Sequence, residues 1–240
     1  MGLFSRKKKR CICGCVVPAA GLGSRMQGAY GEGKQLIELR GMPVLVHTLT
    51  KLEHAQTIDF VVVAVREEEL AEIHRLVQEY GLSKVTQLVV GGETRMQSVA
   101  KGLAALPPCD LVAIHDGARP LASSELIDRV VQAAQQHGAA IPGVAIKDSV
   151  KIRNGQLVQE DLPRDRLVAV QTPQVFPMEE YDAALAYALE KRLSFTDDAA
   201  VYASVLKKPI YLAEGEFCNL KLTTPEDVPL AEFYLGGGWL

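Results

Sequence analysis

The chain has no long apolar segment and no strong excess of charge of either sign. Its 240 residues carry a formal net charge of −3, so no basic field favours nucleic acid as a partner. No apolar run reaches the roughly 20 residues that a membrane span requires. The five cysteines are an odd number, which argues against a secreted disulfide framework. We therefore expect a cytoplasmic protein that binds neither nucleic acid nor membrane.

Two common nucleotide-binding motifs are also missing. The chain contains no G-x-x-x-x-G-K-[ST] loop, and the G-x-G-x-x-G fingerprint fails because Met26 stands where the third glycine should be. These absences disfavour a dinucleotide-dependent oxidoreductase.

A different loop follows the first apolar run. Cys15, Val16 and Val17 predict a buried strand, which leads into the small residues P-A-A-G-L-G at 18–23. Small residues let backbone N–H groups approach an anion, and the cations Arg25 and Lys34 follow. The two glycines alone would equally fit a tight strand-to-helix turn. Together with the cations, the loop predicts a nucleoside triphosphate site.

Apolar runs then alternate with amphipathic segments. Strands are expected at 58–65, 85–90, 111–114, 139–146 and 209–213, and helices at 43–55, 67–80, 95–106, 125–137 and 178–192, with further helices starting near 194–198 and 224–227. This alternation predicts an α/β fold with a doubly wound, mostly parallel sheet. The rhythm breaks at about 147–168, where Asn154-Gly155 is a strong hairpin signal, so a projecting β-arm is expected.

The expected domain organisation is simple. Residues 1–10 form a disordered basic start, 11–235 a single domain and 236–240 a flexible tail. Cys11, Cys13 and Cys15 alternate along the first strand and so share a face. We expect them to be buried as small hydrophobes rather than to ligate a metal.

Several blocks of the chain, spread over residues 16–235, resemble in order the motifs of the 2-C-methyl-D-erythritol 4-phosphate cytidylyltransferases. They are P-A-A-G-x-G-x-R-M with G-K-Q at 33–35, G-G-E-T-R-x-x-S-V at 91–99, H-D-G-A-R-P at 115–120, T-P-Q at 172–174, T-D-D-A at 196–199 and N-x-K at 219–221. The resemblance implies a Rossmann-like nucleotidyltransferase fold. It also implies transfer of CMP from CTP to 2-C-methyl-D-erythritol 4-phosphate, a polyol phosphate, in the non-mevalonate isoprenoid pathway. Mg²⁺ or another divalent cation and a homodimer joined through the arm belong to the same expectation.

The resemblance further implies roles for individual residues. Arg25 and Lys34 match the cations on the triphosphate and its transition state, whereas Arg164 and Lys221 match the pair that positions the acceptor phosphate. Arg164 would serve the partner's site, since it lies in the arm. Ser149 and Thr196 are candidate acceptor contacts. The CTP-binding candidates are Pro18, Ala19, Ala20, Gly21, Gly23, Gly92, Glu93, Ser98, Asp116 and Gly117, and Asp116 is also the metal candidate.

Taken singly, these residues have simpler interpretations. Each cation can be a solvated surface charge, and Thr94 or Ser98 can cap the helix that follows, as Ser194 or Thr196 can cap another. His115 is expected to be structural rather than a general base.

Two departures from the family pattern bear on the site. An insertion at 30–33 lengthens the loop before Lys34, and Phe217-Cys218 stands where some relatives carry an acid. Two other functions stay open, a ribitol-5-phosphate cytidylyltransferase and a nucleotide-binding module without turnover.

Overall fold

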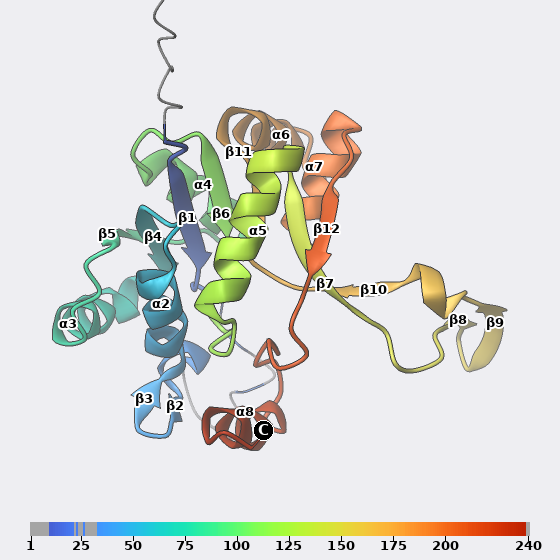
Figure 1. Ribbon diagram of the computed structural model, residues 1–240, viewed down its shortest axis with the longest axis horizontal. Helices are drawn as coiled ribbons and strands as arrows, with labels where there is room; N and C mark the ends of the chain where they lie inside the picture. The colour runs from blue at the N-terminus through green and yellow to red at the C-terminus, as the bar shows by residue number, and fades with distance from the viewer. Residues whose placement is uncertain (1–9, 22, 24–25, 27–32, 239–240) are drawn as a thin grey trace, which may run out of the picture.

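The computed structural model describes residues 10–21, 23, 26 and 33–238. The candidate Arg25, most of the basic start and the end of the tail lie outside the described residues. An eight-stranded sheet in the order β10-β7-β11-β6-β1-β4-β5, with β12 also paired to β7, forms the centre of the molecule (Figure 1). Its strands are β1 (Cys13–Pro18), β4 (Phe60–Val65), β5 (Val85–Val90), β6 (Leu111–Ile114), β7 (Ala140–Ala145), β10 (Val168–Val170), β11 (Gln174–Pro177) and β12 (Tyr211–Glu214).

The middle of the sheet is parallel, as the alternation of strands and helices predicts. β1 pairs in parallel with β4 on one side and with β6 on the other, so that Val16 lies between Val62 and Ile114. After β5 the chain crosses to the other side of β1, and this reversal opens a crevice at the carboxyl ends of the strands. The loops that follow β1 and β6 lie at that crevice.

The sheet also contains antiparallel strands that the sequence analysis did not expect. β11 lies between β6 and β7 and runs antiparallel to both, and β10 pairs antiparallel with β7. Gln174, the last residue of the T-P-Q block, therefore begins β11, and the two residues before it are joined by a cis peptide bond between Thr172 and Pro173. A small hairpin of β2 (Glu38–Leu39) and β3 (Met42–Pro43) was likewise not expected. Strands of two to four residues are too short to show a periodic pattern.

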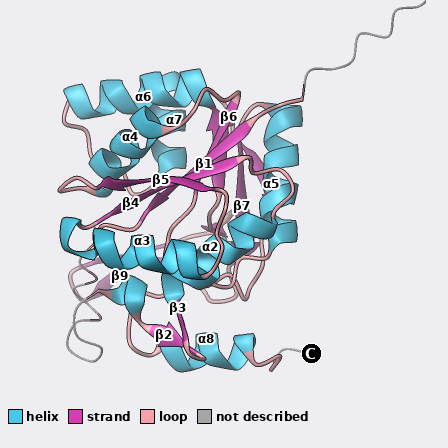
Figure 2. Cartoon of the chain, turned by 90° about the vertical axis from the view of Figure 1, so that its left-hand side faces the viewer, coloured by secondary structure: helices cyan, strands magenta, loops and turns pink. Residues whose placement is uncertain are grey.

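Helices cover both faces of the sheet, which confirms the doubly wound α/β class (Figure 2). One face is covered by α2 (Val44–His54), α3 (Leu70–Glu79) and α5 (Ser124–His137), and the other by α4 (Arg95–Ala105), α6 (Met178–Glu190) and α7 (Asp198–Leu206). The last helix, α8 (Asp227–Leu235), packs beside β2 and β3 below the sheet. Among the described residues, no helix is both long and apolar enough to cross a membrane.

β1 supplies side chains to the cores on both faces. Cys13, Cys15 and Val17 pack in the core under α2 and α5, and burial raises the pKa of the Cys15 thiol. Cys13 and Cys15 are thus small buried hydrophobes, as expected, whereas Cys11 precedes β1 and is only partly buried. Val16 points to the other face and meets α4, where a Cβ on Gly102 would lie 2.4 Å from Val16 Cγ1. Glycine at this position lets α4 approach β1 closely.

The arm projects from one side of the sheet as a hairpin of β8 (Lys151–Asn154) and β9 (Leu157–Asp161) (Figure 1), and η3 (Arg164–Arg166) follows between β9 and β10. Gly155 adopts φ +59° in the turn, a conformation that glycine allows without strain. Every residue of the two hairpin strands is exposed.

One expected cap is wrong. Helix α7 is capped by Asp197, whose carboxylate accepts the N–H of Ala200 at 2.9 Å, rather than by Ser194 or Thr196. Aspartate at this position satisfies the same backbone donors as a hydroxyl would, and it leaves the Thr196 hydroxyl available for other contacts.

Candidate active site

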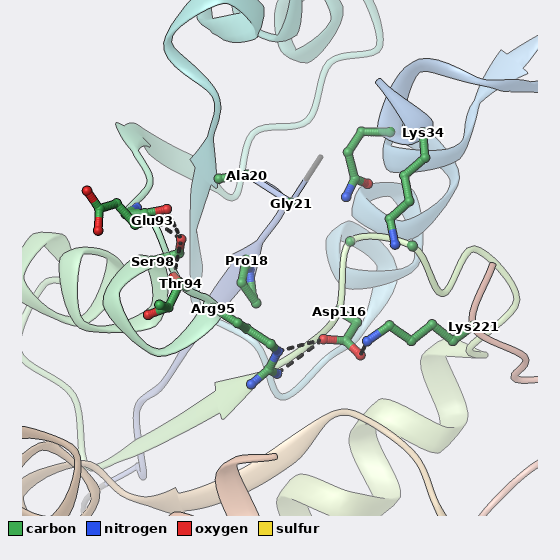
Figure 3. A pocket seen from close by; sticks show the side chains of 14 residues that line it. Pro18, Ala20, Gly21, Lys34, Glu93, Thr94, Arg95, Ser98, Asp116 and Lys221 are labelled. Carbon is green, nitrogen blue, oxygen red and sulfur yellow. Dashed lines mark hydrogen bonds and ion pairs between the residues drawn. The ribbon is translucent and has the colours of Figure 1, made fainter. Parts of the chain in front are cut away.

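A cavity opens at the carboxyl ends of β1 and β6, where loops from five parts of the chain converge (Figure 3). Its lining residues are Pro18, Ala20, Gly21, Lys34, Gln35, Gly92, Glu93, Thr94, Arg95, Ser98, Asp116, Gly117, Ala118 and Lys221. Most of the expected CTP-binding residues are thus brought together with Lys34 and Lys221. Ala19 is fully buried behind the loop.

Two glycine-containing loops form one wall of the cavity. A Cβ on Gly91 would lie 2.3 Å from the Cβ of Ala20, so the loop after β5 touches the loop after β1. By contrast, a Cβ on Gly21 would meet nothing within 4 Å. The backbone at Gly21 is therefore accessible from the cavity, as an anion-binding loop requires.

The start of α4 shapes the second wall. Thr94 caps the helix, accepting the N–H of Gln97 at 3.2 Å, while Gln97 Oε1 accepts the N–H of Thr94 at 3.0 Å. The Ser98 hydroxyl accepts the N–H of Gly92 at 3.0 Å and donates to the carbonyl of Thr94 at 3.0 Å. Thr94 is thus the cap, and Ser98 fixes the shape of the loop that carries Gly92 and the exposed Glu93.

Lys34 reaches the cavity despite the longer loop before it. It begins the 3₁₀ turn η1 (Lys34–Leu36), which follows Gly33 at φ +79°. Its stem lies against Gly23, where a Cβ would be 3.0 Å from Lys34 Cδ. The ammonium donates to the carbonyl of Leu222 at 3.4 Å.

Asp116 lies at the centre of a cluster of cations. Its Oδ1 accepts Arg95 Nε and pairs with Arg95 Nη2, both at 3.1 Å, and its Oδ2 pairs with Lys221 Nζ at 2.8 Å. Arg119 Nε lies 3.7 Å from the same Oδ2. Burial would raise the pKa of Asp116, but Arg95 and Lys221 outweigh burial and hold this pKa well below its usual range. Three cations thus face Asp116 and Asp198, the second carboxylate that pairs with Arg95, so the cluster stays positive, which suits a polyphosphate.

Arg95 and Arg119 belong to this site although the sequence analysis assigned them no role. Arg95 Nη2 also pairs with Asp198 at 2.7 Å, and the Tyr181 hydroxyl donates to the other oxygen of Asp198 at 2.5 Å. Arg119 is buried and donates to the carbonyl of Asn219 at 2.7 Å. Both arginines stand inside the matched blocks G-G-x-x-R and H-D-G-A-R-P, and this position in the sequence could have identified them as site residues.

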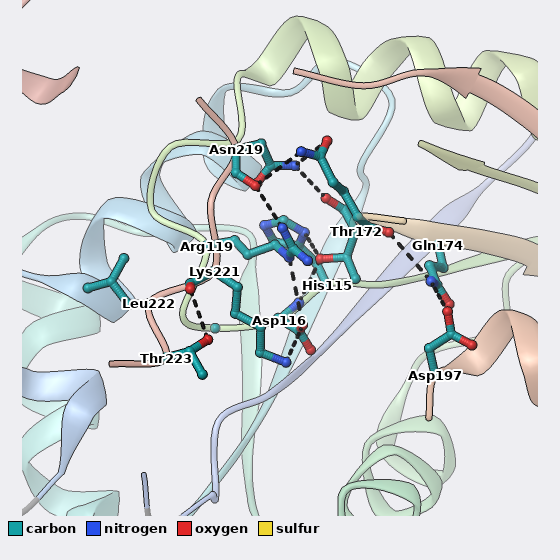
Figure 4. Close-up of polar contacts among 12 residues, drawn as sticks. His115, Asp116, Arg119, Thr172, Gln174, Asp197, Asn219, Lys221, Leu222 and Thr223 are labelled. Carbon is teal, nitrogen blue, oxygen red and sulfur yellow. Dashed lines mark hydrogen bonds and ion pairs between the residues drawn. The ribbon is translucent and has the colours of Figure 1, made fainter. Parts of the chain in front are cut away.

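His115 supports the loop of Asp116 from behind (Figure 4). It is fully buried, and its Nδ1 lies 2.9 Å from Thr172 Oγ1, which also accepts the N–H of Asp116 at 3.1 Å. The Thr172 hydroxyl thus links the His115 ring to the backbone of Asp116. Burial lowers the pKa of His115 to about 4, so the ring is neutral near pH 7. This geometry fits the expected structural role.

A second hollow adjoins the cavity on the far side of the Asp116 cluster. The two share Arg95, Asp116 and Lys221, and the second adds Arg119, Val170, Gln171, Thr172, Gln174, Thr196 and Asp197. Gln174 donates to Asp197 at 3.0 Å and accepts the N–H of Ala199 at 2.8 Å, which ties the start of α7 to β11 (Figure 4). The expected acceptor residues Thr196 and Lys221 therefore line the same hollow.

The two other expected acceptor residues lie elsewhere. Arg164 is in η3 within the arm, where its Nη1 donates to the carbonyl of Lys147 at 2.6 Å. The residue lines a separate hollow near β12. Ser149 is exposed at the base of the arm. Within one chain, neither residue lines the cavity or the second hollow.

Asp116, the expected metal ligand, follows β6 and lines the cavity. The described residues contain no group of three acidic, histidine or cysteine side chains arranged to bind one. Glu216, next to Phe217-Cys218, is tied instead to Ser123, whose hydroxyl donates to it at 2.5 Å. Mg²⁺ is commonly held by one or two carboxylates together with substrate phosphates and water. A single aspartate beside the loop of small residues at 18–21 fits that mode.

The chain matches a known protein family over nearly its whole length. The family model of IspD, 2-C-methyl-D-erythritol 4-phosphate cytidylyltransferase, matches residues 13–237. The proteins of that name from Halalkalibacterium halodurans and Dehalococcoides mccartyi are each 41% identical, covering 92% and 94% of this chain and 95% and 96% of their own. A crystal structure of 4-diphosphocytidyl-2C-methyl-D-erythritol synthase from Anaerococcus prevotii superposes with a TM-score of 0.83 at 30% identity, covering 95% of this chain and 100% of that one.

Proposed function

This chain belongs to the 2-C-methyl-D-erythritol 4-phosphate cytidylyltransferase family, and from this premise we propose that it transfers CMP from CTP to 2-C-methyl-D-erythritol 4-phosphate. The products are 4-diphosphocytidyl-2-C-methyl-D-erythritol and pyrophosphate. The observation that carries the proposal is the pair of adjoining hollows that share Arg95, Asp116 and Lys221. Such a pair offers one compartment for a nucleotide and one for an acceptor phosphate, with cations at the boundary.

The reaction proposed is a direct displacement at phosphorus. An oxygen of the acceptor phosphate attacks the α-phosphorus of CTP, the bond from that phosphorus to the bridging oxygen breaks, and pyrophosphate leaves. Because two anions must meet, the chain contributes alignment and positive charge rather than a covalent nucleophile. Lys34 serves the α-phosphoryl oxygens in this scheme, together with Arg25, which lies outside the described residues.

The base of CTP is proposed to lie at the start of α4. Gly92, Glu93 and Ser98 line the cavity there, and the triphosphate would then follow the loop at 18–21 toward Lys34. Ser98 and the Thr94 capping box keep this wall in shape, so the nucleotide meets a preorganised surface. The acceptor phosphate is assigned to Lys221 and Thr196 in the second hollow.

We propose Mg²⁺, or another divalent cation, as the cofactor, held by Asp116. When bound, it neutralises charge on the triphosphate. Lys221 pairs with Asp116 at 2.8 Å, and this side chain is proposed to turn toward the acceptor phosphate when substrates bind. Arg95 keeps a second carboxylate partner in Asp198, so it holds its place while the charges around Asp116 change.

We also propose a cytoplasmic homodimer joined through the arm. The exposed hairpin carries Leu157 and Val158 with 76% and 68% of their surface accessible, and an isolated hairpin needs a partner for stability. Arg164 does not line the acceptor hollow of its own chain, which supports a role in the partner's site. All five cysteines are free, as in a reducing compartment.

The acceptor is tested by pyrophosphate release with CTP and Mg²⁺. We expect release with 2-C-methyl-D-erythritol 4-phosphate and little with ribitol 5-phosphate offered at the same concentration. Release with ribitol 5-phosphate alone would reassign the acceptor to another polyol phosphate. Binding of CTP without release with either acceptor would instead support a nucleotide-binding module.

A further inference from the structure

One buried ion pair lies near the cavity without lining it. Arg66 follows β4, and Glu69 ends the 3₁₀ turn η2 (Glu67–Glu69). Arg66 Nη2 and Glu69 Oε1 are 2.7 Å apart, with side chains only 12% and 5% exposed. Burying two charges carries a large desolvation penalty, so a buried pair is weak evidence for a stabilising role. A positional role is the alternative, and the neighbours of the pair indicate what it positions.

The pair packs directly against the residue that precedes Lys34. A Cβ on Gly33 would lie 2.5 Å from Glu69 Oε1 and 3.2 Å from Arg66 Nη2. Gly33 has φ +79°, and its carbonyl accepts the N–H of Leu36 at 2.9 Å, which closes the turn that begins at Lys34. The carboxylate thus lies directly against the backbone from which Lys34 departs.

Lys34 is confined on its other side as well. Its stem lies against Gly23, and its ammonium donates to the carbonyl of Leu222 at 3.4 Å. A displacement at Gly33 therefore moves the ammonium relative to the cavity. Misplacing a catalytic group by about 1 Å can cost on the order of 10²-fold in rate.

We propose that Glu69, held by Arg66, is a positioning residue for the Lys34 ammonium. Glu69 lines neither the cavity nor the second hollow and acts through the backbone of Gly33. The inference rests on the proposed role of Lys34 in CMP transfer.

Neighbouring Glu68 provides a matched control. Its carboxylate pairs with the same arginine, Glu68 Oε1 to Arg66 Nη1 at 2.8 Å, but its side chain is 62% exposed, and it is not among the atoms nearest to Gly33. We expect Glu69→Ala to lower kcat for CMP transfer by at least about tenfold, with the KM for the acceptor unchanged within about twofold. Glu68→Ala should keep kcat within about twofold of wild type, as expected for an exposed pair.

Two further variants separate position from charge. Glu69→Gln keeps an oxygen toward Arg66 and Gly33 and should restore kcat to within about threefold of wild type. Glu69→Asp keeps the charge but withdraws it by one methylene, so its kcat should be about fivefold or more below that of wild type. If Glu69→Ala does not fold, Glu69→Asp tests the proposal in its place. In a Lys34→Ala background, Glu69→Ala should change kcat by less than about twofold, because residues that act through one another are not additive.

Hydrogen exchange gives a readout that does not depend on the reaction. The Leu36 amide, bonded to the Gly33 carbonyl, should exchange at least about tenfold faster in Glu69→Ala than in wild type, and at the wild-type rate in Glu68→Ala. Unchanged exchange at Leu36 would overturn the positioning role whatever the activity. An active wild type with unchanged kcat in Glu69→Ala would also overturn it and leave the proposed function standing. A wild type inactive with CTP and acceptor would count against the proposed function alone.

Discussion

At the scale of single residues, the site is organised by one buried carboxylate. Asp116 pairs with Arg95 and Lys221 and stands 3.7 Å from Arg119. His115 and Thr172 hold the backbone beside it. The positive charges therefore belong to a connected network rather than to separate surface residues.

The buried neutral His115 makes stability depend on pH. Folding lowers the pKa of this ring from about 6.5 to about 4. Between those two pH values the unfolded chain binds a proton that the folded chain does not. The contribution of His115 to the free energy of unfolding is therefore complete above pH 6.5 and is lost as the pH falls toward 4. A shift of this size corresponds to a loss of about 3 kcal/mol.

Urea denaturation at a series of pH values measures this effect. Between pH 7 and pH 4, the free energy of unfolding of wild type should fall by about 3 kcal/mol more than that of His115→Asn, in which the titrating ring is absent. Parallel pH profiles for the two proteins would show that His115 does not titrate as argued.

At the scale of elements, the loops are positioned by close contacts between helices and strands. The contact of α4 with β1 is the clearest, because Gly102 faces Val16 where a Cβ would lie at 2.4 Å. Arg95 and Ser98 both lie in α4, so the distance between this helix and the sheet determines the position of one wall of the cavity.

Gly102→Ala is therefore expected to destabilise the protein. The gain in helix propensity is about 1 kcal/mol, whereas overpacking against Val16 costs about 1–3 kcal/mol. We expect a lower Tm, measured by thermal denaturation. In a Val16→Ala background the penalty of Gly102→Ala should shrink, and an equal penalty in both backgrounds would contradict the packing argument.

The sequence predicts elements with a strong period better than short ones. The parallel strands β1, β4 and β6 and the hairpin turn at Gly155 follow from apolar runs and turn chemistry. β11 was not anticipated because four residues, Q-V-F-P, carry no usable period. Only the blocks that match the family predicted which residues come together at the site. Arg95 and Arg119 were assigned no role, because a single charged residue in a sequence resembles an exposed surface charge.

At the scale of the whole molecule, the two cations proposed for the acceptor phosphate lie in different parts of the fold. Lys221 lines the second hollow, whereas Arg164 lies in the projecting arm (Figure 1). A dimer with exchanged arms would unite them, so that each site combines the Lys34 and Lys221 of one chain with the Arg164 of the other.

Mixing two inactive variants tests this arrangement. Lys34→Ala and Arg164→Ala should each lose most activity as pure dimers. After subunit exchange, about half of the dimers are mixed and each contains one intact site, so about a quarter of wild-type activity should return. Activity that stays at the level of the separate variants, in a mixture shown to have exchanged, would contradict a site shared between chains.

The most direct test of the central claim follows the phosphorus atoms of CTP by ³¹P nuclear magnetic resonance. With 2-C-methyl-D-erythritol 4-phosphate and Mg²⁺, we expect one diphosphate diester and one pyrophosphate to form for each CTP consumed. Lys34→Ala should slow this conversion by about 10²–10³-fold while keeping the wild-type Tm. Pyrophosphate released without the diester, or a Lys34→Ala variant as fast as wild type, would contradict CMP transfer at this site.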